Sequence, residues 1–189
     1  MKKTSGNEKP ARKTKNDWLI AALNLLEKSG HEGVIIEHLA ANMHTAKSSF
    51  YWHFKNRNEL LNDLLTYWSE EYTEDLIQEL NNSHLDAADK LYQVMLKIHQ
   101  LELAKYDLVI RAWAKHDLLA RRAVNRVNKL RRNFIRSIFE ELGFRGDELD
   151  MRTRLFVCDH SFETPMFGKL SQKEWEKLAK RRLKLLASK

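Results

Sequence analysis

Between Lys47 and Lys55 the chain gathers hydrogen-bonding and aromatic side chains within barely two helical turns. At 100° per residue, Phe50 and Phe54 point the same way and can pack against preceding helices, whereas Ser48 and Trp52 lie on the opposite side. Small hydroxyls let a helix approach the major groove of DNA closely, where they can contact bases or phosphates. The residue types and their spacing therefore predict a helix presented to DNA.

Basic and polar side chains at both ends of this segment add to the prediction. Lys47 places positive charge where the groove would be entered, and four later side chains can donate to phosphate oxygens: Tyr51, His53, Lys55 and Arg57. Asn56 is placed to cap the next helix, with Glu59 completing a box-like N-terminus. The backbone N–H groups at that N-terminus form a further candidate anion site.

The segment is expected to form a helix of its own that neighbouring helices position. Apolar residues at i, i+3 and i+4 spacing predict helices over about 16–29, 35–43 and 46–54, and a fourth that starts after Asn56 and continues to about Leu80. Ala40, Met43, Phe50 and Phe54 can close a small core, and Gly30 stands where a left-handed C-cap is expected.

The rest of the chain also follows helical periodicity. Helices are predicted over about 86–103, 106–114, 117–142, 147–167 and 171–187. Gly143 followed by Phe144 indicates a Schellman stop, Pro165 should kink or end its helix within a turn, and Ser171 with Glu174 forms a capping box. The sequence thus predicts an all-α protein of about nine helices, with a flexible basic arm (1–13), a DNA-binding head (14–60) and a larger helical domain (61–189).

Composition limits the class of protein. The 189 residues are 43% hydrophobic with only six Gly and two Pro, which excludes disorder over most of the length and favours helices. The net charge is +7, and residues 1–60 hold ten Lys and Arg against six Asp and Glu, as a phosphate-contacting module would. A single Cys158 forms no internal disulfide, and no stretch approaches the ~20 apolar residues of a membrane span. Neither a membrane partner nor a signal peptide is indicated, so cytoplasmic location is expected.

The run SSFYWHFKNRNELL (48–61) resembles the TetR family of bacterial transcriptional regulators, in which a Tyr-(Trp/His)-His-Phe-(Lys/Pro)-(Asn/Ser)-(Lys/Arg) string closes the recognition helix. The resemblance is close over about 14–65. Beyond this it extends to length, helix count and the fragment IRAWAKHD (110–117). It implies that Lys47, Ser48 and Ser49 face bases, that Tyr51, His53 and Arg57 hold phosphates, and that Trp52 lies along the sugar–phosphate wall.

The chain departs from the family pattern where the recognition helix is mounted. Val34 and Ile35 stand where Thr or Ser usually opens the second helix, which weakens that N-cap by roughly 1 kcal/mol. His44 replaces the usual Gly of the turn, and Ala46 replaces the usual capping Ser or Thr, although Thr45 could substitute. These changes affect the rigidity expected of the head and the operator sequence.

A small-molecule effector is expected in the second domain, since helical repressors bind ligands between helices. The candidate lining is aromatic or Met: Trp68, Tyr72, Met95, Tyr106, Trp113, Phe162 and Met166. Each of these side chains is also a plain core residue by its spacing. The basic rows at 121–136 and 180–184 are interpreted as solvated faces, with a secondary DNA-backbone role as the alternative.

A bundle metal site is a second alternative. His99-x-x-Glu102 and His160-x-x-Glu163 have the reverse order of the Glu-x-x-His motif of di-iron bundles, and partner carboxylates are not evident. Neither Cys158 nor any Ser lies in a nucleophile turn, and the chain has no Gly-rich phosphate loop. No metal, other cofactor or enzymatic activity is therefore expected.

The sequence as a whole predicts a DNA-binding transcriptional regulator that binds a pseudo-palindromic double-stranded operator as a homodimer. By resemblance to the family, a ligand-responsive repressor is the default. Dimerisation is expected through about 147–187, where Trp175, Leu178, Leu185 and Leu186 are expected to be exposed. Two alternatives are a constitutive or architectural DNA-binding protein without effector and a helical metalloenzyme.

Overall fold

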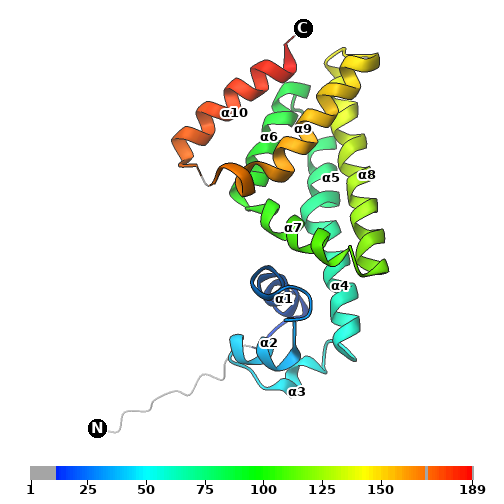
Figure 1. Ribbon diagram of the computed structural model, residues 1–189, viewed down its shortest axis with the longest axis vertical. Helices are drawn as coiled ribbons and strands as arrows, with labels where there is room; N and C mark the ends of the chain where they lie inside the picture. Colours follow the sequence, from blue (N-terminus) through cyan, green and yellow to red (C-terminus); the bar gives the residue numbers. More distant parts are fainter. Residues whose placement is uncertain (1–11, 169, 189) are drawn as a thin grey trace, which may run out of the picture. The chain divides into compact units, whose positions relative to one another are not determined.

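The computed structural model describes residues 12–168 and 170–188, without the side chains of 161–167, and in these residues the secondary structure is entirely helical (Figure 1). Two compact units meet in sequence between Leu61 and Asn62. The described residues form ten α-helices and one π-helical turn, and three of these elements follow one another without a break. The predicted all-α class is confirmed, and with those three counted as one helix the prediction of about nine helices agrees as well.

The first unit contains α1 (Lys15–Ser29), α2 (Ile36–Asn42), α3 (Lys47–Phe50) and the start of α4 (Arg57–Ser69). Its core is aromatic: Trp18 meets the Phe50 ring edge-on at 5.5 Å, and Phe50 stacks on Phe54 at 5.2 Å. Leu26 and Leu39 of the same unit are fully buried as well. Ala40 is buried as predicted, whereas Met43 is half-buried.

Local signals fix the ends of α1. The Thr14 hydroxyl accepts from the Asp17 amide at 3.2 Å, and the Asp17 carboxylate accepts from the Thr14 amide at 2.7 Å, which forms a capping box. These hydrogen bonds hold the pKa of the Asp17 carboxyl below its usual value. Gly30 ends the helix with φ of 68° and donates its N–H to the Leu26 carbonyl.

The second unit is a helical bundle. It contains most of α4, the π turn η1 (Glu70–Glu74), α5 (Asp75–Asn81), α6 (Ala87–Gln100), α7 (Leu103–Trp113), α8 (Leu118–Glu141), α9 (Gly146–Phe167) and α10 (Gln172–Ala187). The long helices α8 and α9 run side by side, and α6 packs between α8 and α10 (Figure 1). α9 ends two residues after Pro165, within the predicted turn.

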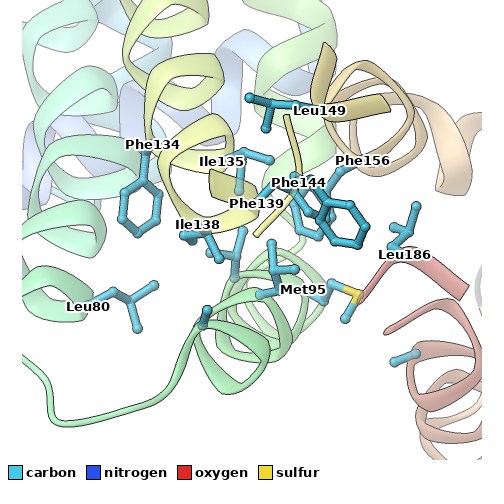
Figure 2. Close-up of a cluster of buried hydrophobic side chains, with 14 of the residues drawn as sticks. Leu80, Met95, Phe134, Ile135, Ile138, Phe139, Phe144, Leu149, Phe156 and Leu186 are labelled. Atoms are coloured by element: carbon cyan, nitrogen blue, oxygen red, sulfur yellow. The ribbon is translucent and has the colours of Figure 1, made fainter. Parts of the chain in front are cut away.

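The main core of this unit surrounds the α8–α9 connection, where Phe139, Phe144 and Phe156 come together (Figure 2). Phe139 contacts Phe144 and Phe156 edge-on at 6.1 and 6.2 Å. The predicted Schellman stop is confirmed: the Phe144 amide donates to the Phe139 carbonyl, the Gly143 amide donates to the Glu140 carbonyl, and Gly143 has φ of 93°. The Schellman motif therefore ends α8, reverses the chain and places the Phe144 side chain in the core.

A polar network is buried at the other end of the bundle. The Asp107 carboxylate accepts from Trp68 Nε1 at 3.2 Å and from the Arg131 guanidinium. Arg131 also donates through Nε to the Thr73 hydroxyl at 2.9 Å and lies over the Trp68 ring. Asp107, Trp68 and Thr73 are all buried, so the network ties four elements together (α4, η1, α7 and α8) through compensated charges.

One turn of the long helix that begins at Arg57 has π geometry. In η1 the Asp75 amide donates to the Glu70 carbonyl five residues earlier, instead of four. Two hydrogen bonds from α8 hold this turn: Glu74 accepts from Arg126 at 2.9 Å, and Thr73 accepts from Arg131. Such turns hold one residue more than an α-turn and are frequent at functional sites.

The C-terminal helix corrects one expectation. α10 begins with the predicted Ser171–Glu174 capping box, but Trp175 is only 4% exposed and Leu186 is buried as well. Trp175 packs on α6, with the His99 ring stacked on it at 4.4 Å and Tyr92 at 6.2 Å. The predicted exposure of Trp175 and Leu186 is wrong because both belong to the core of their own unit, and Leu178 is half-buried. Leu185 alone of the four is clearly exposed, at 75%.

Candidate nucleic-acid interface and ligand cavities

The segment around α3 separates its residues into an inner and an outer set. α3 proper has only four residues, Lys47–Phe50, and hydrogen-bonded turns continue it to Phe54. Phe50 and Phe54 are buried, as their spacing predicted, whereas Tyr51 and Trp52 are 54% and 74% exposed. Ser48, Lys47 and Lys55 are exposed, and Ser49 and His53 are half-exposed. The buried rings of Phe50 and Phe54 thus anchor a segment whose exposed groups are hydroxyls, ammonium groups and aromatic rings.

Lys47 forms an ion pair with Glu37 of α2. The pairing raises the pKa of the Lys47 ammonium and lowers the pKa of the Glu37 carboxyl. Both side chains are about half exposed, so solvent screens the pair and its contribution to stability is small. Lys47 can therefore exchange this carboxylate for a phosphate oxygen at little cost.

Contacts from the N-terminal side complete this surface. The Arg12 guanidinium lies 4.9 Å from the centre of the Trp52 ring, and one ring nitrogen of His53, Nε2, lies 2.9 Å from the Lys13 carbonyl oxygen. Both partners come from the segment expected to be a flexible arm, whose first eleven residues lie outside the described residues. Periodicity gives no signal for Arg12 or Lys13, because their partners lie about 40 residues away in the chain. The one chemical signal for the Arg12 contact was that an exposed Trp ring attracts a cation to its face.

Arg57 is engaged inside the domain. Its Nε donates to the Val34 carbonyl at 2.7 Å, and its Nη2 donates to the His31 carbonyl. These carbonyls belong to the connection between α1 and α2, so Arg57 fastens the start of α4 to the first helix pair. The geometry indicates a structural role for a side chain that the family resemblance assigned to phosphate.

We expect Arg57→Ala to lower the free energy of unfolding by about 2–3 kcal/mol, because two part-buried carbonyls would lose donors on a charged group. Urea unfolding followed by circular dichroism measures the loss. Arg57→Lys is the matched control, since it keeps the charge and can satisfy one carbonyl. A loss below about 0.5 kcal/mol in Arg57→Ala would show that these hydrogen bonds are not structural.

The turn before α3 has the weak caps that the sequence predicted. His44 adopts φ of 51°, in the left-handed region, and Ala46 is the N-cap of α3 without a side-chain hydrogen bond. The substitute cap considered at Thr45 is therefore not made. Ile35 likewise caps α2 without a side-chain bond. Hydrogen bonds of the backbone, from His44 to Ala41 and from Thr45 to Ala40, hold the turn instead.

The start of α4 is capped as expected. Asn56 Oδ1 accepts from the Glu59 amide at 3.0 Å, and the Glu59 carboxylate accepts from the Lys55 amide at 2.7 Å. Glu59 thus places a negative charge at the N-terminus that was considered as an anion site. An incoming phosphate would meet this carboxylate, which weakens the anion-site hypothesis there.

The second unit contains two adjoining cavities, of about 70 Å³ and about 270 Å³. The smaller, here called the inner cavity, lies among α5, α6, α8 and α9 with η1 and Asp107 at its wall. The larger, the outer cavity, lies between α6, α7 and α10. Both are lined by Ile98, Ala104 and His160, so they adjoin.

The candidate ligand residues are distributed unevenly over these cavities. Tyr72 lines the inner cavity and Met95 the outer one. Trp68, Tyr106 and Trp113 are buried in the surrounding core, where Tyr106 stacks on Tyr72 at 5.7 Å. The side chains of Phe162 and Met166 lie outside the described residues. Thr73, Asp107, Arg131, Lys105 and His160 line the cavities without having been predicted to do so.

Basic side chains on α8 mostly have local partners. Arg121 donates to the Ala114 and Lys115 carbonyls at the end of α7, and Arg136 pairs with Asp150. Arg182 of α10 pairs with Asp159 at 2.8 Å.

Among the side chains described, no three His, Cys, Asp or Glu residues gather as metal ligands would. None of the helices searched over the described residues is long and apolar enough to cross a membrane.

Comparisons with known proteins agree with this arrangement. Residues 19–64 match the family model of bacterial regulatory proteins of the tetR family. Among solved structures, a TetR transcriptional regulator from Legionella pneumophila superposes with a TM-score of 0.73 at 14% identity, covering 94% of this chain and 98% of that one. FadR from Bacillus subtilis in complex with stearoyl-CoA gives 0.69 at 19%, covering 93% and 98%.

A third solved structure, the TetR family regulator PfmR from Thermus thermophilus, gives a TM-score of 0.68 at 16% identity and covers 90% of this chain and 96% of that one. The search of curated proteins found no match. At these identities the structural likeness establishes the fold over nearly the whole chain.

Proposed function

We propose that this chain, which carries at residues 19–64 the N-terminal domain of the tetR family of bacterial regulatory proteins, is a DNA-binding transcriptional regulator. The observation that carries the proposal is the exposed set around α3, held from inside by Phe50 and Phe54. In this proposal Lys47, Ser48 and Ser49 face bases, and Tyr51, Trp52, His53 and Lys55 lie along the phosphates. Arg57 supports them from behind through its bonds to Val34 and His31. The protein would act in the cytoplasm.

Selection from a random pool of double-stranded DNA tests this function. The expected product is a pseudo-palindrome whose half-sites lie about one helical turn, or a multiple of it, apart. Footprinting on the selected site should then give one protected patch per half-site. Enrichment without any shared sequence would favour the architectural alternative, and no enrichment would refute DNA reading.

We further propose that the protein acts as a homodimer through α9 and α10. Met151, Leu155 and Cys158 recur on α9 at i, i+4 and i+7 and are all exposed, with Met151 and Leu155 about half accessible. Leu185 adds an exposed apolar side chain on α10. Apolar groups repeated on one helix face support an interface with a second copy of the same face.

Met151→Glu combined with Leu155→Glu is expected to convert the dimer to a monomer, because four carboxylates would be placed in one apolar interface. Light scattering after size-exclusion chromatography at micromolar concentration measures the mass. Leu101→Glu, at an exposed Leu outside this face, is the control and should remain dimeric. A mass for the double variant equal to that of the wild type would place the interface elsewhere.

The regulatory part of the proposal rests on the cavities. The FadR structure is a complex with stearoyl-CoA, and in this chain Tyr72 and Thr73 of η1 line the inner cavity. α4, η1 and α5 are consecutive, so a change of η1 from π to α geometry would turn α4 against α5 by about 100°, one residue of helix. A ligand that binds one geometry better would shift the population of DNA-binding states. The rival without effector predicts no ligand that releases the selected DNA.

A further inference from the structure

The two cavities differ in polarity, and together they suit a ligand with an apolar part and a polar head. The inner cavity is lined mainly by aliphatic and aromatic side chains, among them Leu76, Val94, Phe134, Ile135 and Phe156. The outer cavity is more polar, and its described lining includes one Lys and two His side chains: Lys105, His99 and His160. Ile98, Ala104 and His160 line both, so one molecule can extend from the outer cavity into the inner one.

The charged groups at the polar wall of the inner cavity are already paired. Asp107 accepts from Trp68 and Arg131, Arg131 also donates to Thr73, and the Arg111 guanidinium lies 3.8 Å from the Asp107 carboxylate, so the charged groups here already have partners. Burial raises the pKa of the Tyr72 hydroxyl, with Tyr67 nearby adding to the shift, so this group stays uncharged near neutral pH. A charged group brought against this wall would be desolvated without a free counter-charge. The inner cavity therefore selects an uncharged, apolar group.

The outer cavity favours an anionic head over a cationic one. Among the described side chains that line it, the one carboxylate is that of Glu102, which lies 3.5 Å from the Lys105 ammonium. The Trp in this described lining, Trp175, is 4% exposed, with His99 stacked on its face, so little of that ring is open to a quaternary ammonium. Lys105 is about one-third exposed and can turn from Glu102 to a carboxylate within the cavity.

We propose that the effector, on the premise of the function above, is an aliphatic monocarboxylate: its chain fills the inner cavity and its anionic head lies beside Lys105 and His99. Selectivity then comes from two sides. Each methylene buried in the inner cavity adds apolar contact, and a second charge at the far end of the chain is disfavoured because the Asp107–Arg131 wall is already paired.

Calorimetric titration of the full chain with straight-chain monocarboxylates of increasing length, below micelle-forming concentrations, tests the proposal. Affinity should rise about fourfold per methylene until the inner cavity is full and then level off. The α,ω-dicarboxylate and the alkyltrimethylammonium ion of the best length should each bind at least tenfold more weakly. Equal or tighter binding of the ammonium ion, absence of any length dependence, or no binding by any monocarboxylate would overturn the proposal.

Two variants assign the halves of the ligand. Val94→Phe, which narrows the inner cavity, should move the plateau to shorter chains, and Lys105→Met should reduce the preference for carboxylate at least fivefold. Lys97→Met, at a Lys of α6 that pairs with Glu79, is the matched control and should bind like the wild type. Thermal unfolding checks that each variant folds. Unchanged binding in both folded cavity variants would overturn the placement.

A DNA-release assay distinguishes the class of ligand from the DNA-binding function. Release of the selected DNA is measured in a second assay with the best-bound carboxylate. Tight carboxylate binding without DNA release would support the ligand class and refute the regulatory role. Sequence-specific DNA binding together with no response to any monocarboxylate would preserve the DNA function and refute the ligand class.

Discussion

Replacing Asp107 with alanine is expected to lower the free energy of unfolding by about 3–5 kcal/mol. Asp107 is buried and accepts from both Trp68 Nε1 and Arg131. Its removal takes the main counter-charge from a largely buried guanidinium and leaves an indole N–H without its acceptor. The change also leaves an empty space next to the inner cavity. Urea unfolding of the wild type and the variant gives the difference directly.

Two further variants separate charge from packing. Asp107→Asn keeps the shape and one acceptor for Trp68 but not the negative charge, so it should cost clearly less than the alanine. Asp107→Leu with Arg131→Met removes both charges, and such replacements of buried pairs are often near neutral. If the single alanine variant loses under about 1 kcal/mol, the network does not hold α4, η1, α7 and α8 together as described.

The hydrogen-bond network around Asp107 could not be predicted from the sequence, because its partners are distant in the chain. Helix faces and caps were predictable because their signals are local: Gly143 with Phe144 stops α8, Ser171 with Glu174 starts α10, and Asn56 caps α4. Asp107 looks like a solvated residue on its helix until its distant partners are known. Its donors come from residues 39 and 24 positions away in the chain, and no spacing rule connects them.

Distant partners also explain why the burial of Trp175 on α10 and the role of Arg57 at the candidate site were not predicted. Trp175 was expected to be exposed because α10 alone shows it on an apolar stripe, and the helix that covers it, α6, lies about 75 residues earlier. Arg57 donates to two backbone carbonyls, which are invisible in sequence because every residue has one. The π turn at 70–74 coincides with hydrogen bonds from Arg126 and Arg131 of α8 to Glu74 and Thr73, and these distant partners are not visible in the local sequence. The exposed aromatic residues of the α3 segment were predictable, since Phe50 and Phe54 fix which side is buried.

Changing Lys47 to alanine together with Tyr51 to phenylalanine is expected to weaken binding to the selected operator about a hundredfold. Each change removes one donor to a phosphate or base, and a hydrogen bond to a charged group contributes roughly a factor of ten or more. Both side chains are exposed, and Lys47 loses only its screened pair with Glu37, so stability should change little. Fluorescence anisotropy with labelled operator at several salt concentrations measures affinity and its salt dependence.

The salt dependence identifies the cause of the loss. Removing the Lys47 ammonium should lower the slope of log affinity against log salt, by about one where this charge neutralises a phosphate, because fewer counterions are then released. Lys28→Ala, at a basic residue of α1 in the same unit, is the matched control and should change neither quantity. Arg57→Ala should behave differently from both, since its loss acts through the folded head and would appear in unfolding as well as in binding. Unchanged affinity and slope in the double variant at moderate salt would therefore remove α3 from the DNA interface, whatever the rest of the molecule binds.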